Sequence, residues 1–233
     1  MEIVLALLKK TCEGKKTVLS EIGTVSGYPY SRVRSLITDL ASSRLLTCRG
    51  SVVDIDSVGR LRLAVEAVRN GARLEMVSRS LDFREFEEMS AEALRANAFK
   101  VYVRFIVKHG KRRYEIDIIG RRGPHMICID CKHWGRGLSF SRLSEAVERQ
   151  VERTEALAME LGRYGPRLGI GDLPRIVLVP ALVTLADIEV RTFRRVPVIP
   201  VLRLIDFLAE FDLHLDSMLV IRRDLRESPA STG

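Results

Sequence analysis

The stretch Tyr114–Trp134, YEIDIIGRRGPHMICIDCKHW, decides the fold of the second half of the chain. It reads as two β-strands joined by a tight Gly-Pro turn. Side chains alternate across a strand, so Asp130 and Lys132 are expected to share one face while the intervening apolar side chains point the other way. Asp117 lies on the first strand. Charges among so many Ile residues are costly unless they are paired or bind a cation. The stretch therefore predicts a site of two carboxylates and an ammonium.

Length and composition indicate a globular protein of one large or two small domains. The chain has 233 residues, of which 46% are hydrophobic, enough for a packed core. Its apolar runs, such as residues 176–185, are too short to span a bilayer, and the N-terminus lacks the pattern of a signal peptide. We therefore expect a cytoplasmic protein that does not interact with membranes.

Four cysteines raise the alternative of a metal or disulfide site. Cys128-x-x-Cys131 has the spacing of a ligand pair. On a strand, however, positions three apart face opposite sides, and no second Cys or His pair follows nearby. Buried free thiols in a reducing compartment are the favoured interpretation.

The first 75 residues have the pattern of a winged helix-turn-helix domain. Helices are expected over residues 2–12, 17–23 and 32–46, followed by a hairpin over residues 45–56 with Gly50 at its turn. The net charge of +8 makes a polyanionic partner plausible, because Lys and Arg gain affinity by neutralising phosphates.

The third of these helices would be the recognition helix for DNA. Polar and basic residues gather near its N-terminal end, where such a helix meets base edges or phosphates. The residues expected to contact DNA, including one in the hairpin and one after the second strand of the opening stretch, are Tyr30, Ser31, Arg32, Arg34, Arg49 and Arg136. The alternative is a module that dimerises or binds protein.

The remaining pattern predicts an α/β sandwich with a central mixed sheet. A helix over residues 57–70 and a connector over 72–80 precede a second domain, residues 81–223. That domain should contain a helix, three antiparallel strands, a long helix over 141–165, strands over 175–185 and 196–201, and a helix over 202–211. Residues 224–233 are expected to be a disordered tail.

Residues 81–211 resemble a nuclease domain of the PD-(D/E)xK superfamily, the restriction-endonuclease-like fold, and within it the Mrr-like and archaeal Holliday-junction-resolvase-like branches. The resemblance rests on Phe86-Glu87 of the first helix, Asp117 of the first hairpin strand, and the triplet Asp130 to Lys132. Two departures are that no Pro precedes Asp117 and that Asp fills the first position of the triplet, where Glu is usual.

The resemblance implies a metal centre. Hard oxygen ligands suit Mg²⁺ or Mn²⁺. Asp117 and Asp130 would hold the ion, with the carbonyl of Cys131 and the carboxylate of Glu87 as further ligands. The first-helix acid is ambiguous, because Glu88 and Glu92 lie close to Glu87 in the sequence.

Two further side chains would complete the catalytic set. Lys132 would orient or deprotonate the attacking water and stabilise negative charge. Gln150, on the following long helix, would position the water or Lys132 as in related nucleases, although a polar surface residue is an equal alternative.

The leading hypothesis is a metal-dependent DNA endonuclease targeted by a winged helix. Restriction or defence, junction resolution and repair are not separated by the sequence. The alternative is a DNA-binding transcriptional regulator whose nuclease-like domain is inactive and serves for dimerisation. RNA is less favoured as a substrate, because no aromatic platform for single strands is evident. A homodimer is expected by analogy, since cutting two strands needs two sites.

Overall fold

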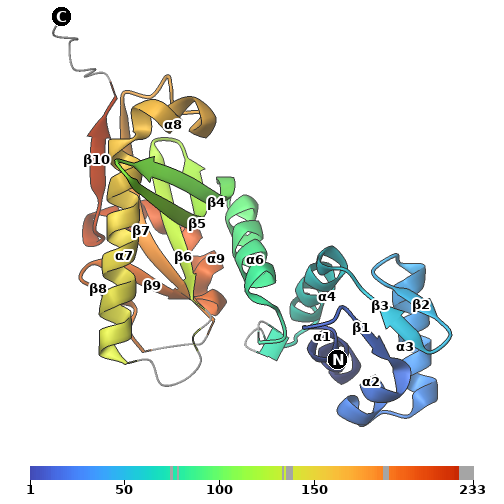
Figure 1. Cartoon of the computed structure of the whole chain (residues 1–233). Helices are drawn as coiled ribbons and strands as arrows, with labels where there is room; N and C mark the ends of the chain where they lie inside the picture. Colours follow the sequence, from blue (N-terminus) through green and yellow to red (C-terminus); the bar gives the residue numbers. More distant parts are fainter. Residues whose placement is uncertain (74–75, 78, 133, 135–138, 186–188, 226–233) are drawn as a thin grey trace, which may run out of the picture. The chain divides into compact units, whose positions relative to one another are not determined.

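A computed structural model describes residues 1–73, 76–77, 79–132, 134, 139–185 and 189–225. The chain forms two compact units, Met1–Met89 (unit 1) and Ser90–Gly233 (unit 2), and each is described by itself (Figure 1). The division falls inside helix α6 (Phe83–Ala96), whereas the sequence placed it between residues 75 and 81. The prediction of an α/β chain with a mixed central sheet is confirmed.

Unit 1 is a helical module with a small antiparallel sheet of order β1-β3-β2. Its elements are α1 (Glu2–Lys10), β1 (Lys16–Val18), α2 (Leu19–Ser26), α3 (Tyr30–Ser42), β2 (Thr47–Arg49), β3 (Val52–Asp54) and α4 (Ser57–Arg69). Gly50 joins β2 to β3 with a φ of 63°, a conformation that glycine adopts without strain. The apolar stripes of α1, α2 and α3 form the core, with fully buried Leu7, Leu8, Leu19, Ile22, Val33 and Ile37.

The expected start of the second helix at Thr17 is wrong. Thr17 and Val18 belong to β1 and pair with Val53 and Val52 of β3. β-Branched residues pack well on a sheet, and this long-range pairing overrides the local helical pattern. The helix begins at Leu19.

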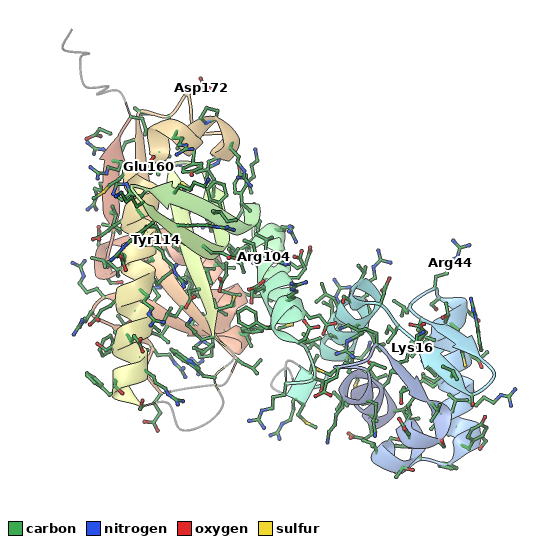
Figure 2. All side chains as sticks on the ribbon, in the orientation of Figure 1. Lys16, Arg44, Arg104, Tyr114, Glu160 and Asp172 are labelled. Carbon is green, nitrogen blue, oxygen red and sulfur yellow. The ribbon has the colours of Figure 1, made fainter. Side chains whose placement is uncertain are left out.

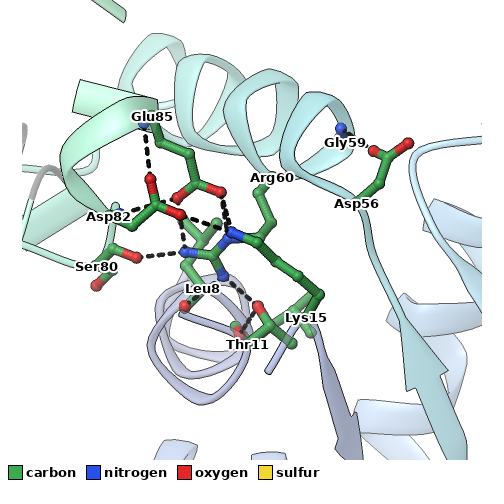
Figure 3. A network of polar contacts seen from close by, with 10 residues as sticks. Leu8, Thr11, Lys15, Asp56, Gly59, Arg60, Ser80, Asp82 and Glu85 are labelled. Atoms are coloured by element: carbon green, nitrogen blue, oxygen red, sulfur yellow. Dashed lines mark hydrogen bonds and ion pairs between the residues drawn. The ribbon is translucent and has the colours of Figure 1, made fainter. Parts of the chain in front are cut away.

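A buried arginine ties three helices of unit 1 together (Figure 3). The Arg60 side chain is fully buried on α4, and its guanidinium Nε donates to Glu85 Oε1 at 2.8 Å. Its Nη1 donates to the carbonyl of Leu8, at 2.6 Å, and to the hydroxyl of Thr11, both near the end of α1. Its Nη2 donates to the Ser80 carbonyl and to Glu85 Oε2. Every N–H that points inward therefore meets an oxygen, as a buried charge requires.

Unit 2 is built on one sheet of order β4-β5-β6-β7-β9-β8, with β10 paired to β7. β6 and β7 are parallel, as are β7 and β9, and the other pairs are antiparallel. The strands are β4 (Lys100–His109), β5 (Arg112–Arg122), β6 (His125–Lys132), β7 (Arg175–Thr184), β8 (Thr192–Phe193), β9 (Val196–Pro200) and β10 (Ile221–Asp224). The helices are α7 (Phe140–Met159), α8 (Leu161–Leu168), α9 (Leu204–Ala209), η1 (Val201–Arg203) and η2 (Phe211–Ser217).

Helices cover both faces of this sheet. Side chains of α7 reach Cys128 and Asp130 of β6, which share a face because they are two residues apart. The end of α6 lies on the opposite face. There Leu94 sits so close to Gly120 of β5 that a Cβ at this position would come within 2.2 Å of its Cδ2. Gly120 thus lets helix and sheet approach closely.

Pro180 lies in the middle of β7, where proline is unusual. The strand is flanked by β6 on one side along its length, whereas on the other side its partner changes. β10 pairs with Arg175–Leu178, and β9 pairs with Leu182–Thr184. Pro180 occupies the interval between these partners, so its missing N–H costs no ladder bond on that side.

Three further expectations need correction. The long helix expected over residues 141–165 is broken at Glu160 into α7 and α8. The strands β8 and β10 were not anticipated, and β10 includes Asp224, which had been assigned to the tail. Leu225, also assigned to the tail, packs against the core of unit 2, and the remaining tail residues, 226–233, lie outside the described residues. No helix in the described part of the chain has the length and apolar character needed to cross a membrane.

Candidate active site

The opening stretch forms a fork between two central strands. β5 and β6 pair from Arg122 and His125 as far as Ile118 and Ile129. Beyond that point β5 continues along β4, whereas β6 continues beside β7. The next two positions, Asp117 and Asp130, therefore stand at the point where the strands diverge.

At this fork the carboxylate of Asp117 accepts a backbone hydrogen bond in place of a carbonyl of the neighbouring strand. The backbone N–H of Cys131 donates to Asp117 Oδ2 at 2.7 Å, and the Asp117 side chain is 9% exposed. On its other side, the pairing of β5 with β4 skips one position, because Arg104 has a φ of 50°. A left-handed conformation costs a non-glycine residue roughly 1–2 kcal/mol. The ladder is thus interrupted on both sides of Asp117, and such strain is typical of functional sites.

Two cations hold the carboxylate of Asp130. Lys132 Nζ lies 2.6 Å from Asp130 Oδ2, and Arg153 Nη1 donates to Asp130 Oδ1 at 2.6 Å. The Asp130 side chain is 4% exposed, whereas those of Lys132 and Arg153 are 28% and 25% exposed. Both oxygens of this buried carboxylate are therefore neutralised at a site that solvent can reach.

Asp117 lacks this compensation. Burial raises the pKa of its carboxyl group to about 6, and the negative charge of Asp130 adds to the rise. The hydrogen bond from the Cys131 N–H and the charges of Arg153 and Lys132 lower the pKa but do not offset these effects. A cation bound beside Asp117 would thus offset the cost of its buried negative charge.

Gln150 is not a surface residue. It is fully buried on α7, and its Nε2 donates to the carbonyl of Cys128 on β6 at 2.7 Å. Its Oε1 has no hydrogen-bond partner among the residues that the structure describes. Gln150 therefore attaches α7 to β6 two residues before Asp130.

The first-helix acid is the one member of the expected set that belongs to unit 1. Glu87 on α6 is buried, with 3% exposure, whereas Glu88 is half-buried. Glu92 is exposed and forms an ion pair with Arg95. Of the three candidate acids, Glu87 is the buried one. That Glu87 is a metal ligand stays a prediction.

The cysteines form no zinc site in the described part of the chain. All four are free, and Cys128 and Cys131 are buried. Burial raises the pKa of the Cys128 thiol to about 12, which disfavours a thiolate ligand. Within the same limits, no group of three or more His, Cys, Asp or Glu side chains gathers to hold a metal ion. An ion at the fork would therefore depend on Asp117, Asp130 and backbone oxygen.

Five of the six residues expected to contact DNA are described by the structure, and all five are exposed. Four of them lie at the N-terminal end of α3 and one on β2: Tyr30, Ser31, Arg32, Arg34 and Arg49. The sixth, Arg136, lies outside the described residues. None of the three described arginines forms an ion pair with a described acid.

Arg153 is the residue of this site that the sequence reasoning missed. It lies three positions after Gln150, and residues with this spacing share a helix face. Assigning Gln150 to the sheet-facing side of α7 would, by the same spacing, have identified Arg153 as a neighbour of β6. That was the available signal.

Comparisons with known proteins leave the family open. No protein-family model matches the chain, and no curated protein matches it. One similar solved structure is the crystal structure of protein VC1899 from Vibrio cholerae, with 14% sequence identity and a TM-score of 0.46. The match covers 93% of this chain and 51% of that one, so the chain spans about half the length of the solved structure. A likeness this distant carries no conclusion about function.

Proposed function

We propose that the chain is a metal-dependent endonuclease that hydrolyses phosphodiester bonds of DNA, with the PD-(D/E)xK nuclease fold in unit 2. The observation that supports this most is the fork. It gathers two buried carboxylates, a lysine and an arginine where the two central strands diverge. A stable core would not require this group, because charges among apolar residues are costly to bury.

The residues at the fork fit Mg²⁺ or Mn²⁺. Asp117 and Asp130 offer carboxylate oxygens, and the carbonyl of Cys131 would be a further oxygen ligand, as the resemblance implies. The raised pKa of Asp117 is the supporting observation, because burial, and after it the charge of Asp130, disfavours the ionised carboxylate, and a bound cation would offset both effects. When bound, such an ion polarises the scissile phosphate and lowers the pKa of the attacking water.

The protein side chains have separate roles in this proposal. Lys132, with its ammonium partly exposed beside Asp130, orients the water and stabilises the negative charge that develops on the phosphate. Arg153 holds Asp130 in place from α7 and is a positioning residue. Gln150 fixes β6 through the carbonyl of Cys128, a bond that uses one of the two N–H groups of its amide.

Unit 1 would deliver the DNA as a winged helix domain. Helix α3 follows α2 after a short turn, and the hairpin of β2 and β3 would be the wing. Exposed Tyr30, Arg32 and Arg34 at the start of α3 and Arg49 on the hairpin supply hydrogen-bond donors and positive charge. Such groups bind phosphates and base edges.

Cleavage assays on the full chain test this proposal. Supercoiled, linear, methylated and four-way-junction DNA and single-stranded RNA are each incubated with and without Mn²⁺. Asp117→Asn, Asp130→Ala and Lys132→Ala should each lose metal-dependent cleavage of DNA. The matched control is Glu115→Gln, an exposed carboxylate on the same strand as Asp117, which should cut as the native chain does. Undiminished cleavage by the Asp130→Ala variant would refute the assignment.

A second candidate function is a DNA-binding regulator with an inactive nuclease-like domain. The observation in its favour is that both oxygens of Asp130 are already paired with cations. Metal binding separates the two functions, because an ion that binds only the native state raises the melting temperature. The endonuclease should show this rise with Mg²⁺ or Mn²⁺ and lose it in Asp117→Asn, whereas a regulator should show none.

A further inference from the structure

Four basic side chains on the start of β4, the end of β5 and helix α8 form a surface that the fork does not use. We call Lys100, Arg121, Arg163 and Arg167 the cationic patch. Lys100 on β4 and Arg121 on β5 are directly opposite each other in the antiparallel register, so their like charges face one another. Like charges at such positions destabilise a sheet.

The charged ends of the Lys100 and Arg121 side chains both lie close to Gly169. A Cβ built on Gly169, just after α8, would lie 3.3 Å from Lys100 Nζ and 3.8 Å from Arg121 Nη2. The Arg121 side chain donates from Nη1 to the Gly123 carbonyl, but its buried Nε has no hydrogen-bond partner in the described structure. Within the described residues none of the four basic side chains forms an ion pair.

Aromatic rings lie between the cations. Arg167 Cζ lies 4.5 Å from the centroid of the Phe105 ring, and Lys100 Nζ lies 5.6 Å from that of Tyr102. The two rings contact each other edge to face, with centroids 6.2 Å apart. A cation over the face of an aromatic ring is attracted by the ring, which favours the observed positions of the Lys100 and Arg167 side chains.

The end of helix α8 does not account for this charge. Cations are favoured near the carbonyls at a helix C-terminus. Here, however, the Leu168 carbonyl accepts from the Tyr102 hydroxyl at 2.9 Å. The carbonyls of Pro166 and Gly165 accept from the backbone N–H groups of Gly169 and Ile170. The cations are thus not needed as a cap.

We propose that the cationic patch binds the phosphate backbone of nucleic acid at a position separate from the fork. This proposal rests on the proposed function in assuming that unit 2 meets DNA. Arg121 and Asp117 are four residues apart on β5, which corresponds to about 13 Å along the strand. That distance is comparable to the width of the major groove, about 12 Å. A duplex with one strand at the fork therefore presents phosphates of its other strand to the patch.

Binding is measured in EDTA, so that it does not depend on cleavage. A labelled duplex of about 30 base pairs is titrated with the full chain at several salt concentrations, with fluorescence anisotropy as the readout. The double variant Lys100→Ala/Arg121→Ala should bind about ten-fold more weakly at 0.1 M salt. Its slope of log K against log salt should be shallower by about 1.8, because each lost phosphate contact contributes about 0.9.

Two further variants serve as controls. Arg222→Ala/Arg223→Ala removes the same charge from exposed positions on β10 and should leave affinity and slope within error of the native chain. Lys100→Arg/Arg121→Lys keeps the charge and should keep the binding. If the first double variant unfolds, Arg163→Ala/Arg167→Ala replaces it, because both arginines are exposed on α8.

The outcomes distinguish this proposal from the nuclease proposal. Equal losses in the patch variant and the β10 control would overturn the patch. The patch proposal would also be overturned if the patch variant bound DNA as the native chain does while inorganic phosphate raised the melting temperature of the native chain but not of the variant. That result would assign the surface to a small phosphorylated ligand. If the patch variant weakens binding and no metal-dependent cleavage is found, the patch stands and the nuclease proposal fails.

Discussion

Replacing Asp117 by asparagine should stabilise unit 2 while abolishing its proposed activity. The amide oxygen of asparagine can still accept the hydrogen bond that Cys131 donates to Asp117. The substitution removes a buried negative charge that faces a second one on Asp130. The residue proposed to bind the metal therefore destabilises the fold when no metal is bound.

The magnitude follows from the pKa of Asp117. Its rise from 3.8 to about 6 corresponds to about 3 kcal/mol, because a tenfold change in proton affinity is worth about 1.4 kcal/mol. The folded chain binds this proton more tightly than the unfolded chain does, so protonation of Asp117 stabilises the folded state. This stabilisation is complete below pH 3.8 and is lost as the pH rises through about 6. The gain in Asp117→Asn should thus be about 3 kcal/mol at pH 8 and about 1.5 kcal/mol at pH 5.

Trp134 makes this measurement specific to unit 2. It is the only tryptophan of the chain and packs against the core beside α7, so its fluorescence follows unfolding of this unit. Urea titrations in EDTA between pH 5 and pH 8 give the free energy of unfolding of both chains. A variant that is less stable than the native chain at pH 8, or equally stabilised at both pH values, would refute the reasoning. Glu115→Gln serves as the control and should show no such trend.

Three more results are expected from the described contacts. Glu85→Ala leaves the buried guanidinium of Arg60 without its carboxylate partner and should lower the free energy of unfolding of unit 1 by about 3–5 kcal/mol, measured by urea titration. Replacing both Glu85 and Arg60 by apolar residues should restore part of the lost stability. Gly120→Ala should lower the stability of unit 2 by about 1–3 kcal/mol through overpacking, and a double-mutant cycle with Leu94→Ala should show relief. The Cys128 thiol, whose pKa burial raises to about 12, should react with a thiol reagent at pH 8 only after denaturation, and the two half-buried thiols should react first.

Local pattern was sufficient where the strands carry their own signal. The alternation around Asp117 and Asp130 predicted two neighbouring strands, and the structure has both as β5 and β6. The divergence of these strands was not predictable, because it depends on their other neighbours, β4 and β7. The strand conformation of Thr17 was not predictable for the same reason, because it depends on pairing with a residue of β3 that lies far along the chain.

The contacts of α7 were not predictable because they depend on how this helix is rotated about its axis relative to the sheet. An amphipathic pattern shows which side of α7 faces inward, but not which strand residue each side chain meets. Arg153 reaches the Asp130 carboxylate across that interface, whereas Gln150 ends on a backbone carbonyl. Most of the charged residues that the structure describes are exposed, among them Lys16, Arg44, Arg104 and Asp172, which Figure 2 labels, so charge alone did not single out Arg153.

Pro180 has a consequence for how the sheet assembles. β7 shares one edge between two later segments, and the residue between them has no N–H with which either could extend its pairing. Neither β9 nor β10 can slide along β7 into the place of the other without losing a bond. The pairing of β7 with β9 is therefore separated from its pairing with residues 221–224 by a residue that can extend neither of them. Pro180 thus fixes the boundary between two ladders that share the same edge of a single strand.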